Sequence, residues 1–262
     1  MRSITIGQYY PGGSIIHRLD ARVKLIGVFA HITALLLTNN FIGYGIAALY
    51  VALVIWVCKV PINLMLKGLR SILFVLMFAV TINLFLTPGD TVLVSVFFIR
   101  VTLEGILMAL QMTSRLVLLI IGSSLLTLTT SPIKLTDGIE ALLSPLKIIK
   151  LPAHDIAMMM TIALRFIPTL VDEMQKIMKA QKARGADFTS GNIIKRAKNM
   201  LPILIPLFVS AFKRADELAT AMESRCYRGD VKRTKMKEIK MTPKDWVALG
   251  VVGIVTAVII IV

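Results

Sequence analysis

An uncharged run of seventeen residues sets the structural class of this chain: FIGYGIAALYVALVIWV, from Phe41 to Val57. A helix needs about 20 apolar residues to cross the hydrocarbon core of a bilayer, and about 17 is the usual lower limit. Lys59 and Pro61 close the run, and both residues favour a helix end near the membrane surface. The run therefore predicts a membrane-spanning helix.

Similar apolar runs lie on both sides of this segment. The preceding run, Leu25–Leu37, has only thirteen residues, so it crosses only if the helix begins a turn earlier and Arg22 and Lys24 extend to the headgroups. Three further runs follow, at residues 71–86, 105–130 and 246–262. The segment Val92–Leu103 is rich in Val and Phe and fits a crossing, a surface-lying piece or a short hairpin, so we expect five or six spans.

The composition agrees with a membrane protein. Of 262 residues, 56% are hydrophobic and only 17% are charged, whereas soluble domains are about 45–50% apolar. The same figures exclude a disordered chain and a collagen, and two cysteines are too few for a disulfide scaffold. We therefore expect an all-α fold, a polytopic membrane protein with about five to six transmembrane helices.

The basic residues are concentrated in one part of the chain. The formal net charge is +15, and seventeen of the thirty Lys and Arg residues fall between Lys176 and Lys244, together with six acidic residues. Cytoplasmic loops carry the excess of Lys and Arg, so we expect this block and the N-terminus in the cytoplasm, with Arg100 as an exception outside. We interpret the tract Lys232–Lys244 as a surface anchor for anionic lipid, and nothing in it indicates nucleic acid binding.

The segment from Ala153 to Gly229 is periodic but highly charged, so we expect it outside the bilayer. Apolar residues recur at helical spacing in both halves and predict two long amphipathic helices: Phe166, Leu170, Met174, Ile177 and Met178 in the first, and Ile193, Ala197, Leu201, Leu204, Phe208, Ala211, Ala215, Leu218 and Met222 in the second. Pro168 interrupts the first helix, and Pro202 and Pro206 interrupt the second. Both helices should therefore be kinked.

Each of these helices ends in an arginine between two small residues, Ala183-Arg184-Gly185 and Ser224-Arg225-Cys226. The two arginines lie 41 positions apart, which makes the motif an internal repeat. Small neighbours leave a guanidinium unhindered, and its planar fork of five donors can meet carboxylates or carbonyls in a partner's groove. A single such triplet is usually a solvated helix end, because basic residues suit C-terminal turns. Its duplication favours a pair of docking sites.

Several segments together resemble the transmembrane subunit of energy-coupling factor (ECF) transporters, the T component (EcfT/CbiQ-like). These segments extend over almost the whole chain: Ser14–Leu25, Leu126–Pro132, Ala163–Pro168, Ala180–Phe188 and Ala221–Tyr227. In this order, the first is similar to that family's opening sequence and the second to a segment that closes a span. The other three are similar to its two coupling helices.

The resemblance implies the scaffold of an ABC-type importer. Two cytoplasmic coupling helices would dock on two ABC ATPase subunits, and a small integral-membrane substrate-binding S component would capture a vitamin or a metal ion. The second triplet departs from the family's Ala-Arg-Gly pattern at both flanks, although its flanking residues are still small. The implied ATPase-coupling residues are Ala183, Arg184, Gly185, Ser224, Arg225 and Cys226, with no catalytic or metal-binding residue and no cofactor.

The resemblance also implies a multi-pass protein of the bacterial plasma membrane that is not itself an enzyme. The sequence has no Gly-rich loop ending in Gly-Lys-Ser/Thr, so ATP would be handled by a partner chain. The expected domains are an N-terminal transmembrane domain (1–152), a cytoplasmic coupling-helix domain (153–230), and a basic linker with a C-terminal transmembrane helix (231–262). The separate S component would choose the transported substrate.

Two other functions compete with this one. An intramembrane enzyme would need a nucleophile or metal motif, but Gly122-Ser123-Ser124 is only a partial serine turn and the three histidines lack metal-binding spacing. An autonomous permease that binds its own solute would show charged pairs inside the membrane, and only Arg115 qualifies. For Arg115 a structural role is favoured over a functional one.

Two pairs of small residues at a spacing of four could allow close helix contacts, Gly43 with Ala47 and Gly253 with Ala257. Such pairs also arise often by chance in an apolar sequence. They therefore identify candidate contact faces and nothing more specific.

Overall fold

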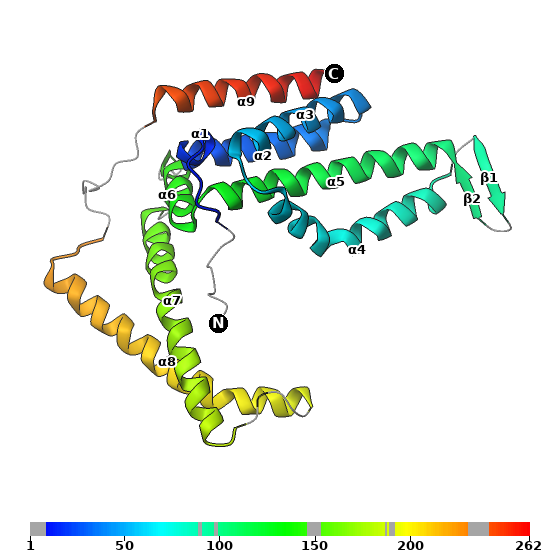
Figure 1. Cartoon of the computed structure of the whole chain (residues 1–262). Helices are drawn as coiled ribbons and strands as arrows, with labels where there is room; N and C mark the ends of the chain where they lie inside the picture. The colour runs from blue at the N-terminus through cyan, green and yellow to red at the C-terminus, as the bar shows by residue number, and fades with distance from the viewer. Residues whose placement is uncertain are drawn as a thin grey trace. The chain divides into compact units, whose positions relative to one another are not determined.

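The computed structural model describes residues 9–88, 91–96, 99–145, 153–186, 188, 192–229 and 241–262 (Figure 1). The chain divides into two compact units. Unit 1 comprises Met1–Leu142 and Glu238–Val262, and unit 2 comprises Leu143–Lys237. The C-terminal helix therefore belongs to the same unit as the N-terminal helices, although unit 2 separates them in the sequence.

Unit 1 is built from long apolar helices joined by short connections. The described elements are α1 (Ile15–Arg18), α2 (Ala21–Leu37), α3 (Phe41–Cys58), α4 (Ile62–Leu86), β1 (Val92–Val96), β2 (Ile99–Thr102), α5 (Leu103–Thr129), α6 (Pro132–Leu143) and α9 (Pro243–Ile261). Polar caps mark where several of them begin. The side chain of Asp20 accepts a hydrogen bond at the start of α2, and the side chain of Thr102 does so at the start of α5.

The two strands form a small antiparallel hairpin in which Val96 pairs with Ile99. Of the three possibilities that the sequence left for residues 92–103, the hairpin is the one observed. All other regular elements in the described residues are helices. The prediction of an all-α, polytopic membrane protein is confirmed, with this hairpin as a minor addition.

Four described helices are long and apolar enough to cross a membrane: α3, α5, α9 and α7 (Ala153–Ala183). Helix α4 is a fifth if its two parts, Ile62–Arg70 and Ile72–Leu86, count as one span bent by 60°. The second part corresponds to the apolar run predicted at residues 71–86. Helix α2 has 17 residues, about the lower limit for a membrane-spanning helix. Helix α7 qualifies despite its charged C-terminal half, because its N-terminal half is much more apolar.

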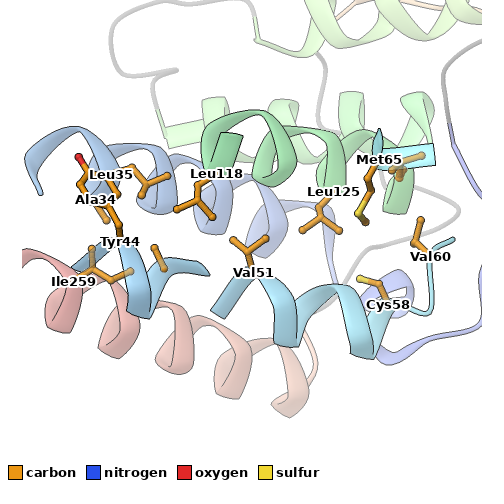
Figure 2. Close-up of a cluster of buried hydrophobic side chains, with 12 residues drawn as sticks. Ala34, Leu35, Tyr44, Val51, Cys58, Val60, Met65, Leu118, Leu125 and Ile259 are labelled. Atoms are coloured by element: carbon orange, nitrogen blue, oxygen red, sulfur yellow. The ribbon is translucent and has the colours of Figure 1, made fainter. Parts of the chain in front are cut away.

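The core of unit 1 lies where α2, α3, α5 and α9 meet. Figure 2 shows side chains from these helices facing a shared interior. Ala34, Leu35 and Ala47 are completely buried. The cluster consists of Ala34, Leu35, Tyr44, Ala47, Val51, Cys58, Val60, Met65, Leu118, Leu125, Leu128 and Ile259.

One of the two small-residue pairs lies at a helix contact. A Cβ on Gly43 would come within 2.4 Å of the Thr38 side chain and 3.3 Å of the Ile259 carbonyl oxygen, so this position has no room for a larger residue. Ala47 on the same helix is buried. By contrast, a Cβ on Gly253 would meet no atom within 4 Å, and Ala257 is exposed. Close α3–α9 packing therefore uses the first pair only.

Hydrogen bonds at the two ends of unit 1 define the directions of its helices. At one end, which we call the Lys24 end, the backbone N–H of Asp20 donates to Asp245 Oδ1 at 2.9 Å, and Lys24 Nζ donates to the Thr129 carbonyl at 3.0 Å. At the other end, Thr38 Oγ1 donates to the Ile259 carbonyl at 3.0 Å. Helices α2 and α9 are therefore parallel, and α5 runs antiparallel to both.

Arg115 has a structural role in this packing. Its Nε donates to the Tyr44 hydroxyl at 2.8 Å, and its Nη2 donates to the Thr38 carbonyl at 3.0 Å. Its guanidinium also lies 5.8 Å from the centre of the Tyr44 ring, within cation–π range. Arg115 thus joins α5 to the α2–α3 turn, in agreement with the structural interpretation of this arginine.

Candidate docking site at two helix ends

Unit 2 contains two long amphipathic helices, α7 (Ala153–Ala183) and α8 (Ile193–Ser224). They cross at an ion pair in which Arg214 Nη2 lies 3.0 Å from Glu173 Oε2. The Ser210 hydroxyl donates to the other oxygen of the same carboxylate at 2.5 Å. Figure 1 shows this crossing and shows that α8 changes direction along its length. The bend in α8 agrees with the kink expected from Pro202 and Pro206.

The end of α7 has the geometry of a Schellman motif, in which two backbone N–H groups after the helix fold back onto its last carbonyls. Ala186 N donates to the Gln181 carbonyl at 3.0 Å, and Gly185 N donates to the Lys182 carbonyl at 3.0 Å. Gly185 has φ +85°, the left-handed conformation that this motif requires and that glycine adopts without penalty. Arg184 is consequently the C-cap residue.

The end of α8 repeats this geometry bond for bond. Tyr227 N donates to the Met222 carbonyl at 3.0 Å, and Cys226 N donates to the Glu223 carbonyl at 2.8 Å. Arg225 is again the C-cap residue. The left-handed position is occupied here by Cys226, with φ +56°. A side chain at such a φ carries a steric cost of roughly 1–2 kcal/mol, which glycine avoids.

The two predicted docking arginines therefore occupy equivalent positions at two equivalent helix ends. Arg184 and Arg225 are both exposed, and the described part of the chain shows no hydrogen bond or ion pair for either guanidinium. The flanking residues Ala183, Gly185, Ser224 and Cys226 are exposed as well. Each end thus presents a planar cation with unhindered donors, suited to carboxylate or carbonyl acceptors.

Sequence reasoning identified the two triplets but missed the cap that they share. Gly185 signals a helix end because glycine favours the left-handed conformation. Cys226 carries no such signal, so the equivalence of the two ends is apparent only from the backbone hydrogen bonds.

Helix α8 also has a large exposed apolar surface. Six of its apolar side chains are each at least 40% exposed, and Phe212 reaches 73%. A contiguous apolar surface of this kind is unusual on a solvated helix and is typical of an interface with protein or lipid. We call these residues the α8 apolar stripe: Leu201, Leu204, Ile205, Phe208, Val209 and Phe212. The predicted apolar face shares Leu201, Leu204 and Phe208 with it.

The described residues contain no group of three or more His, Cys, Asp or Glu side chains that could hold a metal ion. Two histidines of unit 1 have local contacts instead. His17 Nδ1 lies 2.7 Å from the Ser14 hydroxyl, and His31 Nε2 lies 3.3 Å from the Leu118 carbonyl. The candidate site is therefore a docking surface built from the two arginine triplets and the α8 apolar stripe.

Comparisons with known proteins extend over nearly the whole chain. Residues 12–236 match a family described as cobalt transport protein (CbiQ). A protein of Ruminiclostridium cellulolyticum named energy-coupling factor transporter transmembrane protein EcfT is 55% identical over 251 residues, 96% of this chain and 94% of its own length. Proteins with the same name from Thermosediminibacter oceani and Bacillus subtilis are 50% and 46% identical, covering 97% and 94% of this chain and 96% and 92% of their own lengths.

Proposed function

The chain belongs to the CbiQ family of cobalt transport proteins, together with the transmembrane components of ECF transporters, and we propose that it is the coupling scaffold of an ABC-type importer. As a transporter membrane subunit it has a non-catalytic role. In the proposal, two partner ATPases hydrolyse ATP, and the scaffold converts their movement into reorientation of a small S component that captures a vitamin or metal ion. The ATPases bind at Arg184 and Arg225.

The observation that carries this proposal is the repeated helix end. Two arginines occupy the C-cap position of two identical Schellman motifs, on helices that cross at the Glu173–Arg214 pair. An importer with two ATPase subunits needs two equivalent attachment points on its membrane subunit. The two helix ends supply these attachment points. Because α7 and α8 contact each other, a movement of one helix end would be transmitted to the other helix.

The helix directions in unit 1 support a cytoplasmic location for both arginines. Helix α5 ends and α9 begins at the Lys24 end, so the intervening chain leaves and returns on one side of the membrane. If α7 crossed the bilayer, a second crossing would be needed before α9, and α8 is not apolar enough to supply it. We therefore propose α2, α3, α4, α5 and α9 as the spans, with the N-terminus, α7 and α8 in the cytoplasm as the excess of basic residues requires.

The α8 apolar stripe supports a membrane-protein partner. Its residues are too exposed to belong to the interior of unit 2 and too apolar for a solvated surface. An integral-membrane S component has apolar surface of its own, so contact with the stripe would bury both. One scaffold would then hold the ATPases by its arginines and the S component by this stripe.

Co-purification tests the proposal. The tagged full-length chain is isolated from its native cells in mild detergent, as wild type, Arg184→Glu and Arg225→Glu. We expect two ATPase subunits and at least one small membrane protein with the wild type. Each reversal should remove ATPase, because reversing a buried, hydrogen-bonded charge in an interface costs several kcal/mol.

Matched controls are Lys182→Glu and Lys213→Glu, which make the same charge change at exposed positions on the same two helices, outside the triplets. These variants should retain the ATPases. Equal loss from the controls would mean a general charge effect and contradict the assigned sites. A wild-type chain that purifies alone, yet still supports solute uptake in cells, would favour the autonomous permease.

A further inference from the structure

Unit 1 contains a cavity of about 620 Å³ that the proposed coupling function does not use. It lies among α1, α2, α3, α5 and α9, and apolar side chains make up nearly all of its surface. Each of the four long helices contributes to its lining, for example through Val23 of α2, Val51 of α3, Leu125 of α5 and Val251 of α9. Because these helices belong to the membrane-embedded unit, hydrocarbon is the surrounding medium from which such a cavity would be filled.

The cavity has a positive end. Lys24 and Lys244 both line it, whereas no Asp or Glu does among the described residues. The two lysines lie at the same end of unit 1, since the start of α9 is hydrogen-bonded to the start of α2 through Asp245 and Asp20. Lys244 is exposed. The cavity therefore combines an apolar interior with two cations at one end.

Lys24 is an unusual residue for an apolar site, because it is only 8% exposed and a buried charge is costly unless it is compensated. Its ammonium donates to the carbonyls of His17 at 3.3 Å and Thr129 at 3.0 Å. An ammonium has three N–H donors, so these two bonds leave one for a further acceptor. No ion pair of Lys24 is present in the described residues.

The two carboxylates at this end cap helices and do not line the cavity. Asp245 Oδ1 accepts from the backbone N–H of Asp20 at 2.9 Å, and its Oδ2 accepts from Thr242 N and Oγ1 at 2.8 and 2.6 Å. Asp20 Oδ1 accepts from Arg22 N at 3.0 Å. These bonds keep both carboxylates in capping positions outside the cavity lining, so the charged side chains that line the cavity are the two lysines.

We propose that this cavity binds an anionic membrane phospholipid, with one acyl chain among α2, α3, α5 and α9 and the headgroup phosphate at Lys24 and Lys244. Basic pockets between transmembrane helices at the cytoplasmic surface are suited to anionic headgroups. The α9 residues that line the cavity extend from Lys244 to Val252, roughly 12 Å along the helix. This length accommodates the part of an acyl chain that lies nearest the headgroup. The bound lipid would compensate the charge of Lys24 and fill the cavity.

Native mass spectrometry tests this site on the full-length chain, with whatever subunits it retains. The protein is released from nanodiscs that contain equal amounts of phosphatidylglycerol and phosphatidylcholine, and the retained lipids are identified by mass. Wild type should retain phosphatidylglycerol in preference to phosphatidylcholine. Lys244→Gln should lower this retention about fivefold, the factor expected for one basic residue at a membrane surface. Ala248→Phe places a large ring in the cavity lining and should abolish retention.

Two matched controls separate the site from general lipid contact. Lys59→Gln removes an exposed lysine that follows Cys58 but does not line the cavity, and Ala257→Phe enlarges an exposed α9 residue outside it. Both should retain lipid as wild type does. Lys24→Met deprives two carbonyls of their donor and is expected to impair folding, so Lys244→Gln is the decisive variant.

Equal retention of the two lipids by wild type would overturn the proposal. So would an equal loss with Lys59→Gln and Lys244→Gln. A photocrosslinker at position 248 provides an independent readout, for which we expect adducts with phospholipid. Adducts with a protein subunit in place of lipid would mean that another chain covers the cavity, and would likewise overturn it.

Discussion

At the residue scale, the most informative position is Cys226. It is one of two described non-glycine residues with a positive φ, and it occupies the position that Gly185 occupies at the other helix end. The repeated motif thus keeps its backbone conformation even where the side chain opposes it. This favours a role for the cap itself, because the cap sets the direction in which the adjacent arginine leaves the helix.

We predict opposite effects for two substitutions at this pair of positions. Cys226→Gly should stabilise the end of α8 by roughly 0.5–1 kcal/mol, since relief of the left-handed strain exceeds the entropic cost of glycine. Gly185→Ala should destabilise the end of α7 by about 1 kcal/mol. Hydrogen exchange of the backbone N–H groups of Ala186 and Tyr227 in the full-length chain measures both. Faster exchange at Tyr227 in Cys226→Gly would contradict the assigned cap.

Arg115 provides a second prediction at this scale. Arg115→Leu removes the donors to the Thr38 carbonyl and the Tyr44 hydroxyl, so unit 1 should lose about 1–3 kcal/mol of stability. Thermal unfolding in detergent measures the loss. Arg70→Leu is the matched control, because Arg70 is exposed in α4, and it should change the midpoint little. Equal midpoints for both variants would refute the structural role of Arg115.

At the scale of the helices, the contact between α7 and α8 depends on few polar groups. Glu173 accepts from both Ser210 and Arg214, and the Tyr227 hydroxyl lies 3.0 Å from Met158 Sδ. The α8 apolar stripe remains exposed. A pair of helices joined at a crossing, with free surfaces on either side, can change its angle without disrupting a large core.

A charge-swap experiment tests this contact. Arg214→Glu places two carboxylates together at the crossing, and Glu173→Arg places two guanidinium groups there, so each single variant should lower solute uptake in cells. The double variant Glu173→Arg, Arg214→Glu restores opposite charges and should recover much of the uptake. Amounts of protein and bound ATPase are measured in parallel. If the double variant is no better than the single variants, the ion pair does not contribute to coupling.

At the scale of the whole molecule, residues 131–242 connect two helices that meet at the same end of unit 1. The apolar half of α7 would allow a crossing by composition, but the return to α9 requires an even number of crossings in this segment. Connectivity and composition therefore disagree on α7. We therefore propose that α7 lies outside the bilayer, because the chain must return to the Lys24 end to begin α9.

Cysteine labelling tests the resulting topology. In a background with Cys58→Ala and Cys226→Ala, single cysteines are introduced as Pro88→Cys, Lys182→Cys and Lys198→Cys, all at exposed positions. A membrane-impermeant maleimide should label position 88 in intact cells, and positions 182 and 198 only after permeabilisation. Labelling at 182 in intact cells would mean that α7 crosses the membrane.

The amino-acid sequence alone determined the features that depend on local composition. The uncharged run Phe41–Val57 corresponds almost residue for residue to α3, because the length of an apolar run directly limits a span. The same holds for the end of the first amphipathic helix, where Gly185 marks a helix stop by its own conformational preference. The resemblance to the family was also apparent from the sequence, since the segments that carry it are short and contiguous.

The tertiary structure alone decided the features that depend on neighbours far apart in the sequence. The partners of Arg115, the pairing of Glu173 with Ser210 and Arg214, and the apolar cavity lined in part by α9 all join segments separated by more than 30 residues. The left-handed conformation of Cys226 is equally hidden, because cysteine has no preference for it. No local pattern encodes these contacts, since their stability arises only when the helices pack.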